Sequence, residues 1–203
     1  MHRLSLVFSF VVLSLSVSQC VCAADAVSKE SAASIRDGLE GLVEAALKPG
    51  ELDDIVAGLH KPARDRMEKY ADGKFPDLDA QIDEFLKSWK AKYKKTPAFS
   101  SEKNHEQILN YTYTAGADAK HATVTIPAAH GLPEVKFEVV NEVRDNWMIA
   151  IDAKTTGEQL KDRLVKAISA LNAHKDSLPE DVTEAYRLVA HHVFVAISNT
   201  PEK

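Results

Sequence analysis

Three side chains on or next to the predicted strands carry the groups that acid–base catalysis uses. They are Asp152, at the end of the last predicted strand, and Tyr113 and His121 on two earlier strands. A carboxylate, a phenol and an imidazole can exchange protons with a substrate when burial or a neighbouring charge adjusts their pKa values. Spacing in the sequence does not bring them together, and Asp152 can equally cap the loop before Thr155. These three residues are the catalytic candidates if the protein is an enzyme.

Aromatic side chains supply the candidates for ligand binding. Trp89, Tyr111 and Trp147 are large, amphipathic side chains that would line a pocket if they faced one. Trp89 also belongs to an apolar helical stripe with Tyr93, and such a stripe is more often part of the core. The sequence leaves both interpretations open.

The eight histidines of the chain do not follow the spacing of a metal site. His191 and His192 are adjacent, so on a helix they point in different directions and cannot chelate one ion as an i, i+4 pair would. The histidines in predicted turns or helix ends have no regular spacing: His60, His105, His130 and His174. The sequence has no HExxH, no GxSxG and no glycine-rich phosphate loop. We predict no metal site and no cofactor.

The N-terminus has the three parts of a secretory signal peptide. A short basic start at residues 1–3 precedes an apolar run at 4–17, and Ala23 and Ala24 offer small residues for cleavage. The run is too short to span a membrane. We expect residues 1–24 to be removed and the mature protein to be secreted or periplasmic, with no membrane span.

A lipid anchor is the alternative. Cys20 or Cys22 would then be retained and acylated, although Gln19 and Val21 are not the small residues that such processing prefers before the cysteine. Removal of a signal peptide takes away both cysteines, so the mature chain would have no disulfide and no cysteine-bound metal.

The balance of charge excludes one class of partner. The 203-residue chain carries 25 Lys and Arg against 30 Asp and Glu, a net charge of −5, and loss of Arg3 makes the mature protein more acidic still. Affinity for nucleic acid comes mainly from neutralising phosphates, so we expect no nucleic-acid partner. We expect an unidentified small molecule or protein as the partner, with a homodimer as a further option.

Helical periodicity dominates the first half of the mature chain, after a flexible leader at residues 25–33. Apolar residues at helical spacing predict helices at 35–46, 52–59, 62–70 and 77–93.

Alternation with a period of two takes over in the middle of the chain. It predicts strands at 108–114 and 121–126 and a β-hairpin at 135–152, in which Phe137 and Val139 share one face. The connections are short, and no helix separates one strand from the next. Helices followed by an antiparallel meander of about four strands are typical of an α+β fold.

An αα-hairpin follows the sheet. We divide the mature chain into an α+β domain at 34–153 and a C-terminal helical hairpin at 154–199. Three helix starts carry capping signals, namely Asp77, Thr155 with Glu158, and Ser177 with Glu180. The sequence does not decide whether the hairpin packs on the sheet or stands apart.

The last strands resemble those of a known superfamily. Phe137 and Val139 on one arm are followed by Asn-Trp-Met-Ile-Ala-Ile-Asp at 146–152. After a group of helices, this pattern resembles the nuclear transport factor 2-like superfamily over about residues 34–152. The resemblance implies a curved sheet that forms a cone around an apolar pocket. A cystatin-like arrangement, with helix 77–93 packed on the sheet, is the alternative fold.

The resemblance implies two classes of function. We expect an exported, non-catalytic binding or interaction module with an apolar pocket. The alternative is a small-molecule isomerase or hydrolase of the same fold that uses Asp152 with Tyr113 or His121. Converging titratable groups in the pocket would favour the enzyme, whereas an apolar or filled interior would favour the module. A lipid-anchored envelope protein is the third option.

Overall fold

The computed structural model describes residues 26–50, 52–71, 73–99, 108–143 and 146–198. The predicted signal peptide and its cleavage residues, Cys20, Cys22, His105 and turn residues 144–145 lie outside this part of the chain. Within the described part, no helix is long and apolar enough to cross a membrane.

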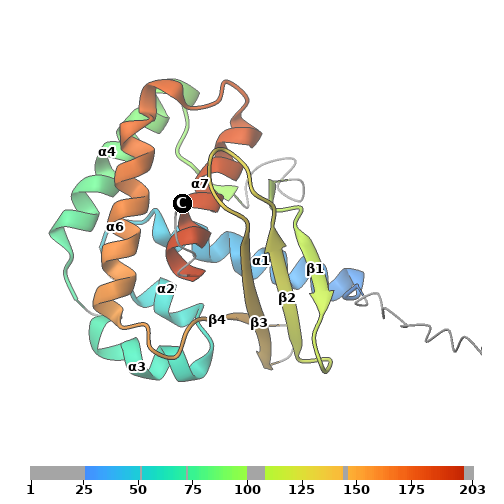
Figure 1. Ribbon diagram of the computed structural model, residues 1–203. Coiled ribbons are helices and arrows are strands. Elements are labelled where there is room, and N and C mark those ends of the chain that lie inside the picture. Colours follow the sequence, from blue (N-terminus) through green and yellow to red (C-terminus); the bar gives the residue numbers. More distant parts are fainter. Residues whose placement is uncertain (1–25, 51, 72, 100–107, 144–145, 199–203) are drawn as a thin grey trace, which may run out of the picture.

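The chain is an α+β protein in which helices precede and follow an antiparallel sheet (Figure 1). The N-terminal helices are α1 (Lys29–Ala46), α2 (Asp53–Ala57), α3 (Lys61–Ala71) and α4 (Pro76–Tyr93). The strands are β1 (Thr112–Ala115), β2 (His121–Ile126), β3 (Val135–Val143) and β4 (Asn146–Ala150). The C-terminal elements are α6 (Gly157–Ala173), the short 3-10 helix η2 (Lys175–Ser177) and α7 (Val182–Ser198). The predicted fold class is confirmed.

The sheet is an open meander in the order β1-β2-β3-β4, and each strand is antiparallel to the next. The register places Val124 opposite Phe137 and Val139 opposite Ile149, so these side chains share the inner face. The outer face carries Thr123, Thr125, Lys136 and Glu138. Apolar residues on one face and polar residues on the other explain the alternation in the sequence. β1 is shorter than the predicted strand 108–114 and begins only at Thr112.

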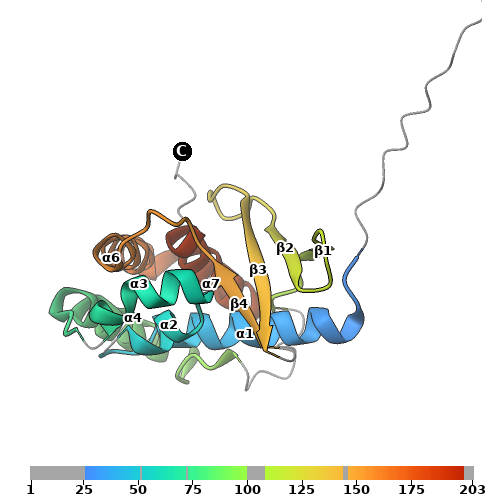
Figure 2. The ribbon, with the colours of Figure 1, turned by 90° about the horizontal axis from the view of Figure 1, so that it is seen from below.

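Helix α7 covers the inner face of the sheet. It packs against β3, α1 and α6, and both views show it between the sheet and α6 (Figure 2). The Phe194 ring stacks on Phe137 with 5.5 Å between centroids and meets the edge of Tyr111 at 6.1 Å. Residues on almost every side of α7 are buried in one continuous core cluster. The C-terminal hairpin therefore packs on the sheet, and the core runs across the predicted boundary between 153 and 154.

Helix α4 packs against α6 rather than against the sheet. Its Trp89 is fully buried, with the ring 4.8 Å from Tyr186 of α7. The cystatin-like alternative, with helix 77–93 on the sheet, is therefore wrong. The second helix beside the sheet is α1, which passes β4 closely enough that a Cβ at Gly38 would lie 3.1 Å from the carbonyl oxygen of Trp147.

Helices α1 and α4 begin differently from the prediction. Helix α1 begins at Lys29 because the Ser28 hydroxyl accepts a hydrogen bond from the Ser31 N–H at 3.1 Å. Residues 29–33, which the prediction placed in a flexible leader, therefore belong to this helix. Helix α4 begins at Pro76, so Asp77 lies in the first turn and is not the cap. Its carboxylate still complements the positive end of the helix dipole there.

The last two helix starts shift by one and four residues. The capping box of α6 is formed by Thr156 with Gln159, and not by Thr155 with Glu158. The carboxylate that caps α7 is Asp181, which accepts the N–H groups of Thr183 at 2.7 Å and Glu184 at 3.1 Å. The prediction that Ser177 and Glu180 form this cap is therefore wrong.

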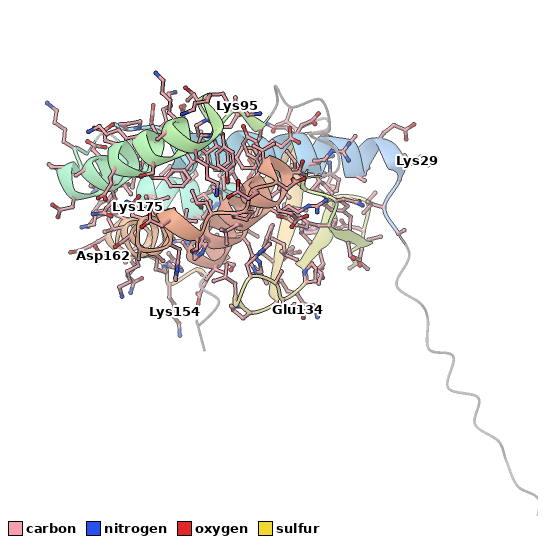
Figure 3. All side chains as sticks on the ribbon, turned by 90° about the horizontal axis from the view of Figure 1, so that it is seen from above. Lys29, Lys95, Glu134, Lys154, Asp162 and Lys175 are labelled. Carbon is pink, nitrogen blue, oxygen red and sulfur yellow. The ribbon has the colours of Figure 1, made fainter. Side chains whose placement is uncertain are left out.

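Charged side chains surround this core. Figure 3 shows Lys29, Lys95, Glu134, Lys154 and Asp162 on the outside of the molecule, and they come from different elements. Charge of either sign is therefore spread over the elements rather than gathered on one of them.

A half-buried carboxylate joins the sheet to the N-terminal helices. Glu142 accepts hydrogen bonds from His60 Nδ1 at 2.6 Å, the Lys61 N–H at 2.5 Å and Arg64 at 3.1 Å. Burial of this carboxylate opposes its ionisation, but these three donors outweigh burial and lower the pKa of Glu142. Beside it, the backbone N–H of His60 donates to the carbonyl oxygen of Ile149 at 2.8 Å. This hydrogen bond attaches the α2–α3 connection to β4.

Replacing Glu142 by Gln should lower the free energy of unfolding by about 1–2 kcal/mol, because charged hydrogen bonds of this kind contribute about that much. The effect should vanish on acidification, since a carboxylate with a lowered pKa stabilises the fold only above that pKa. Urea denaturation at neutral and acidic pH measures both. The matched control is Glu138→Gln on the exposed face of the same strand, which should change stability by less than about 0.5 kcal/mol. Equal effects of the two substitutions would contradict this role of Glu142.

Candidate functional site

The structure does not bring the three catalytic candidates together. Tyr113 lies opposite Val124 on the inner face, and its hydroxyl donates to the carbonyl of Leu109 at 2.7 Å. His121 lies on the outer face, where Nδ1 contacts Asp118 at 2.7 Å. Asp152 is exposed after β4 and accepts the N–H of Lys154 at 2.8 Å. Each side chain therefore has a local partner in a different place.

The three aromatic candidates also separate. Trp89 belongs to the core between α4 and α7, as its helical stripe indicated. Trp147 lines a groove between α1, α2 and β4, and Tyr111 lines a cavity beside α7. Two of the three predicted ligand-binding residues thus lie at hollows of the surface, although at different ones.

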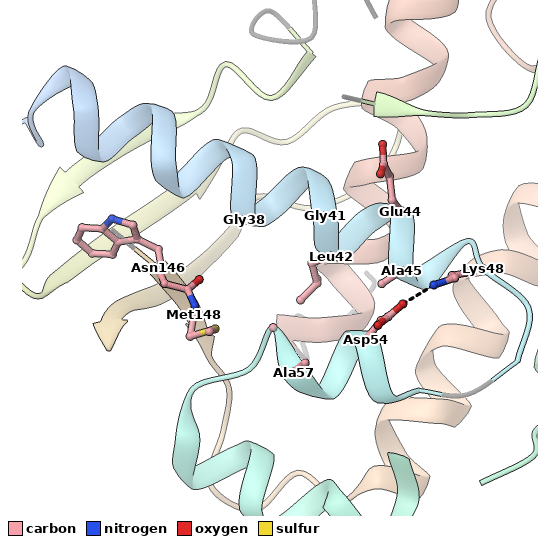
Figure 4. Close-up of a pocket in the computed structure, with 12 residues that line it drawn as sticks. Gly38, Gly41, Leu42, Glu44, Ala45, Lys48, Asp54, Ala57, Asn146 and Met148 are labelled. Atoms are coloured by element: carbon pink, nitrogen blue, oxygen red, sulfur yellow. Dashed lines mark hydrogen bonds and ion pairs between the residues drawn. The ribbon is translucent and has the colours of Figure 1, made fainter. Parts of the chain in front are cut away.

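The groove beside Trp147 has a volume of about 570 Å³, and we name it the α1–β4 groove (Figure 4). Its α1 wall includes the small residues Gly38, Gly41 and Ala45, together with Leu42 and Glu44. At its end, Lys48 and Asp54 form an exposed ion pair at 2.6 Å, so these two charges already satisfy one another. The groove offers shape, and one of its lining residues, Trp147, has a buried indole Nε1 without a hydrogen-bond partner among the described residues.

A different arrangement occurs at the loop between β2 and β3, residues 127–134. His130 has a φ of 55° and Gly131 a φ of 78°, so the loop turns sharply at a non-glycine residue in the left-handed region. The loop is attached to α7, because Nε2–H of His191 donates to the carbonyl of Pro133 at 2.8 Å. It lies between two cavities that share His130.

The larger of these, the histidine cavity, has a volume of about 480 Å³. It is formed by the 127–134 loop, the end of α6 and the connection to α7. Its lining residues are His130, Gly131, Leu132, Pro133, Ala170, His174, Ser177, Pro179, Leu188 and His192. Three imidazoles line it, and no Asp or Glu is among the lining residues. Nδ1 of His192 is buried and has no hydrogen-bond partner in the described part of the chain.

The smaller one, the tyrosine cavity, has a volume of about 310 Å³ on the other side of the loop. Its polar lining comes from Asn110, Tyr111, His130, Glu184, Arg187 and His191. Glu184 forms an ion pair with Arg187 and lies 3.9 Å from Nε2 of His130. The Tyr111 hydroxyl is buried and finds no hydrogen-bond partner among the described residues. Both volumes are within the range of small-molecule sites, roughly 300–1,000 Å³.

Burial keeps the α7 histidines neutral. It lowers the pKa of His192 to about 4, and the neighbouring His191, His174 and His130 act in the same direction, since each would add positive charge. Burial also lowers the pKa of His191. On the other side, burial raises the pKa of Tyr111, so its hydroxyl stays protonated. At neutral pH the imidazoles of His191 and His192 and the phenol of Tyr111 are therefore neutral.

Sequence reasoning did not predict this cluster. It did predict correctly that His191 and His192 point in different directions, since they line different cavities. A signal was available, because two histidines interrupt the apolar segment 189–197, and His130-Gly131 lies between two prolines. Across the described ranges, no group of three or more His, Cys, Asp or Glu side chains is arranged to hold a metal ion.

Comparisons with known proteins do not identify this arrangement. No family model matches the chain, and searches of curated proteins and of solved structures return no similar protein. The resemblance to the nuclear transport factor 2-like superfamily therefore remains a prediction.

Proposed function

We propose that this protein is an exported binding module that holds a small molecule in the cavities on either side of the 127–134 loop. The observation that carries the proposal is that one residue in the wall of each cavity has a buried polar atom without a hydrogen-bond partner among the described residues, namely the Tyr111 hydroxyl and Nδ1 of His192. A buried polar group without a hydrogen bond costs about 1–3 kcal/mol, so such groups in a cavity wall favour a ligand that supplies the missing partner.

The filled space beside the inner face of the sheet favours a binding module over an enzyme with a large central pocket. Phe194 and its neighbours on α7 occupy the inner face, where the predicted apolar pocket would lie. Two of the remaining hollows lie beside residues 184–192 of α7, where both cavities combine apolar walls with a few polar groups. This combination is the usual composition of a small-molecule site.

Replacing Tyr111 by Phe should abolish or strongly reduce ligand-induced stabilisation and should raise the free energy of unfolding of the free protein by about 1–3 kcal/mol, because it removes a buried hydroxyl that has no partner in the described structure. The matched control is Tyr113→Phe. That hydroxyl donates to Leu109, so its loss should cost about 1 kcal/mol and leave the ligand response intact.

The measurement is thermal melting of residues 25–203 with a panel of small molecules, lipids and peptides. A ligand at about a hundred times its dissociation constant should add about 2.7 kcal/mol, a shift of several degrees. Equal loss of the response in both Tyr variants would contradict the assignment of the site. No shift with any compound would favour a protein partner, for which a pull-down from the envelope fraction is the next experiment.

An enzyme of the isomerase or hydrolase type is the second candidate. The observation in its favour is the convergence of His130, Glu184 and Tyr111 at the tyrosine cavity, since acid–base chemistry needs such groups together. Asp152 and His121 have no part in it. The two functions separate when the ligand found in the panel is incubated with the protein and analysed by mass spectrometry. Recovery of unchanged ligand supports the module, and conversion supports the enzyme.

Export is the other half of the proposal and rests on the apolar segment at 4–17. Mass spectrometry of the mature protein should find an N-terminus near residue 24 or 25. An acylated Cys20 or Cys22 would instead establish the lipid-anchored alternative.

A further inference from the structure

The walls of the histidine cavity combine two kinds of surface. Imidazoles reach it from three elements: His130 from the 127–134 loop, His174 from the end of α6, and His192 from α7. Between them lie the apolar side chains of Leu132, Pro133, Ala170, Pro179 and Leu188. No Asp or Glu is among its lining residues, so none of them can supply a negative charge to balance a proton that the imidazoles take up.

The titratable groups around His192 are all imidazoles. Besides burial, His191, His174 and His130 lower the pKa of His192. The carboxylate of Glu184 lies 3.9 Å from His130 but lines the tyrosine cavity and is paired with Arg187. His192 is only 7% exposed, and its Nδ1 lacks a partner in the described structure. A protonated imidazole there would lack a counterion of its own.

We propose that the histidine cavity binds an organic carboxylate with an apolar body, and that binding takes up one proton from solvent onto the imidazole cluster. The inference rests on the proposed function and names the chemistry of its ligand. The carboxylate supplies the counterion and the hydrogen-bond acceptor that a protonated imidazole needs. The leucine and proline side chains cover the apolar body of the ligand.

Proton uptake determines how affinity depends on pH. Burial disfavours the charged form of His192 in the free protein, whereas a bound anion favours that form. Binding that takes up one proton strengthens about tenfold for each unit by which the pH falls, as long as the free site is neutral and the bound site is charged. A neutral ligand of the same shape gains nothing from the proton.

The test uses phenylacetate and its neutral analogue phenylacetamide as probes in isothermal titration calorimetry. Phenylacetate should bind about 10- to 100-fold more tightly at about pH 5.5 than at about pH 7.5, and phenylacetamide should show no such change. Repeating the titration in two buffers with different heats of ionisation should give an uptake of about one proton per phenylacetate. Equal binding of the two probes, binding without proton uptake, or no binding of phenylacetate would overturn the inference.

Variants locate the proton. His192→Phe should remove the pH dependence of phenylacetate binding, and His174→Gln, at an exposed position, provides a second test if the first variant does not fold. The matched control is His121→Gln on the outer face of the sheet, which should bind as the wild type does. If neutral panel compounds give a shift that depends on Tyr111 but phenylacetate does not bind, the proposed function stands and this inference fails. If no compound gives a shift, both fail.

Discussion

Deleting residues 155–203 should abolish cooperative unfolding, because the deletion removes the helix that covers the inner face of the sheet. Helix α7 is buried on nearly all sides, and its Phe194 stacks on Phe137 of β3. Without it, the apolar inner face of the sheet and one side of α1 would be exposed to water. Circular dichroism of the truncated chain should show no sharp thermal transition. A truncated chain that melts cooperatively at the wild-type temperature would show that the N-terminal part folds alone.

The same contact can be weakened without truncation. Phe194→Ala in the full chain should lower the free energy of unfolding by about 3–5 kcal/mol, the usual range for a large aromatic side chain removed from a core. Native domains are stable by only about 5–15 kcal/mol, so this is a large part of the total. The control is Lys166→Ala on the exposed side of α6, for which we expect less than about 0.5 kcal/mol. A loss below about 1 kcal/mol for Phe194→Ala would contradict the central position of α7.

Acidification should destabilise the free protein through His192 by up to about 3 kcal/mol. The pKa of this imidazole is lowered to about 4 in the folded protein, whereas the unfolded chain has the ordinary value of about 6.5. Above pH 6.5 both states are neutral and the group has no effect. Below pH 6.5, His192 is protonated in the unfolded chain but stays neutral in the folded protein, so the free energy of unfolding falls until the pH is below about 4.

Urea denaturation at several pH values between about 7.5 and 4 measures this effect. The variant His192→Phe should lose less stability than the wild type over this range, while His121→Gln, on the outer face of the sheet, should follow the wild type. The carboxylate of Glu142 acts in a more acidic range, because its lowered pKa lies below 4.5. Parallel pH profiles for the wild type and His192→Phe would contradict the assignment of a buried neutral imidazole.

Much of the fold could be predicted because one face of each element is apolar. The alternation in 121–126 and 135–143 predicted both strands, since one face of the sheet is covered and the other is exposed to solvent. Phe137 and Val139 lie inward as expected. Helix starts were less predictable. Two overlapping boxes, Thr155 with Glu158 and Thr156 with Gln159, fit the same pattern.

The sequence does not show the tertiary contacts that favour one helix start or one packing arrangement over another. Helix α6 begins at Gly157, where the ring of Tyr70 lies so close that a Cβ would come within 2.5 Å of its Cγ. Likewise, α4 and α1 have similar apolar stripes, and only the packed structure shows that α1 lies beside the sheet and α4 does not.

The candidate site could not be assembled from the sequence for a related reason. His130, His174 and His192 come from a loop, a helix end and a helix, and no regular spacing joins them. They meet only because α7 lies on the sheet and the 127–134 loop folds over it. Asp152, His121 and Tyr113 were chosen for their residue types on predicted strands, and each has a local partner elsewhere.

The binding site itself is tested most directly by nuclear magnetic resonance of labelled protein titrated with the compound that gives the largest thermal shift. If the account is correct, the perturbed signals cluster at Tyr111, the 127–134 loop, His174 and residues 184–192, because these line the two cavities. Perturbations that cluster instead on α1 and the start of β4 would place the ligand in the α1–β4 groove and contradict the central claim.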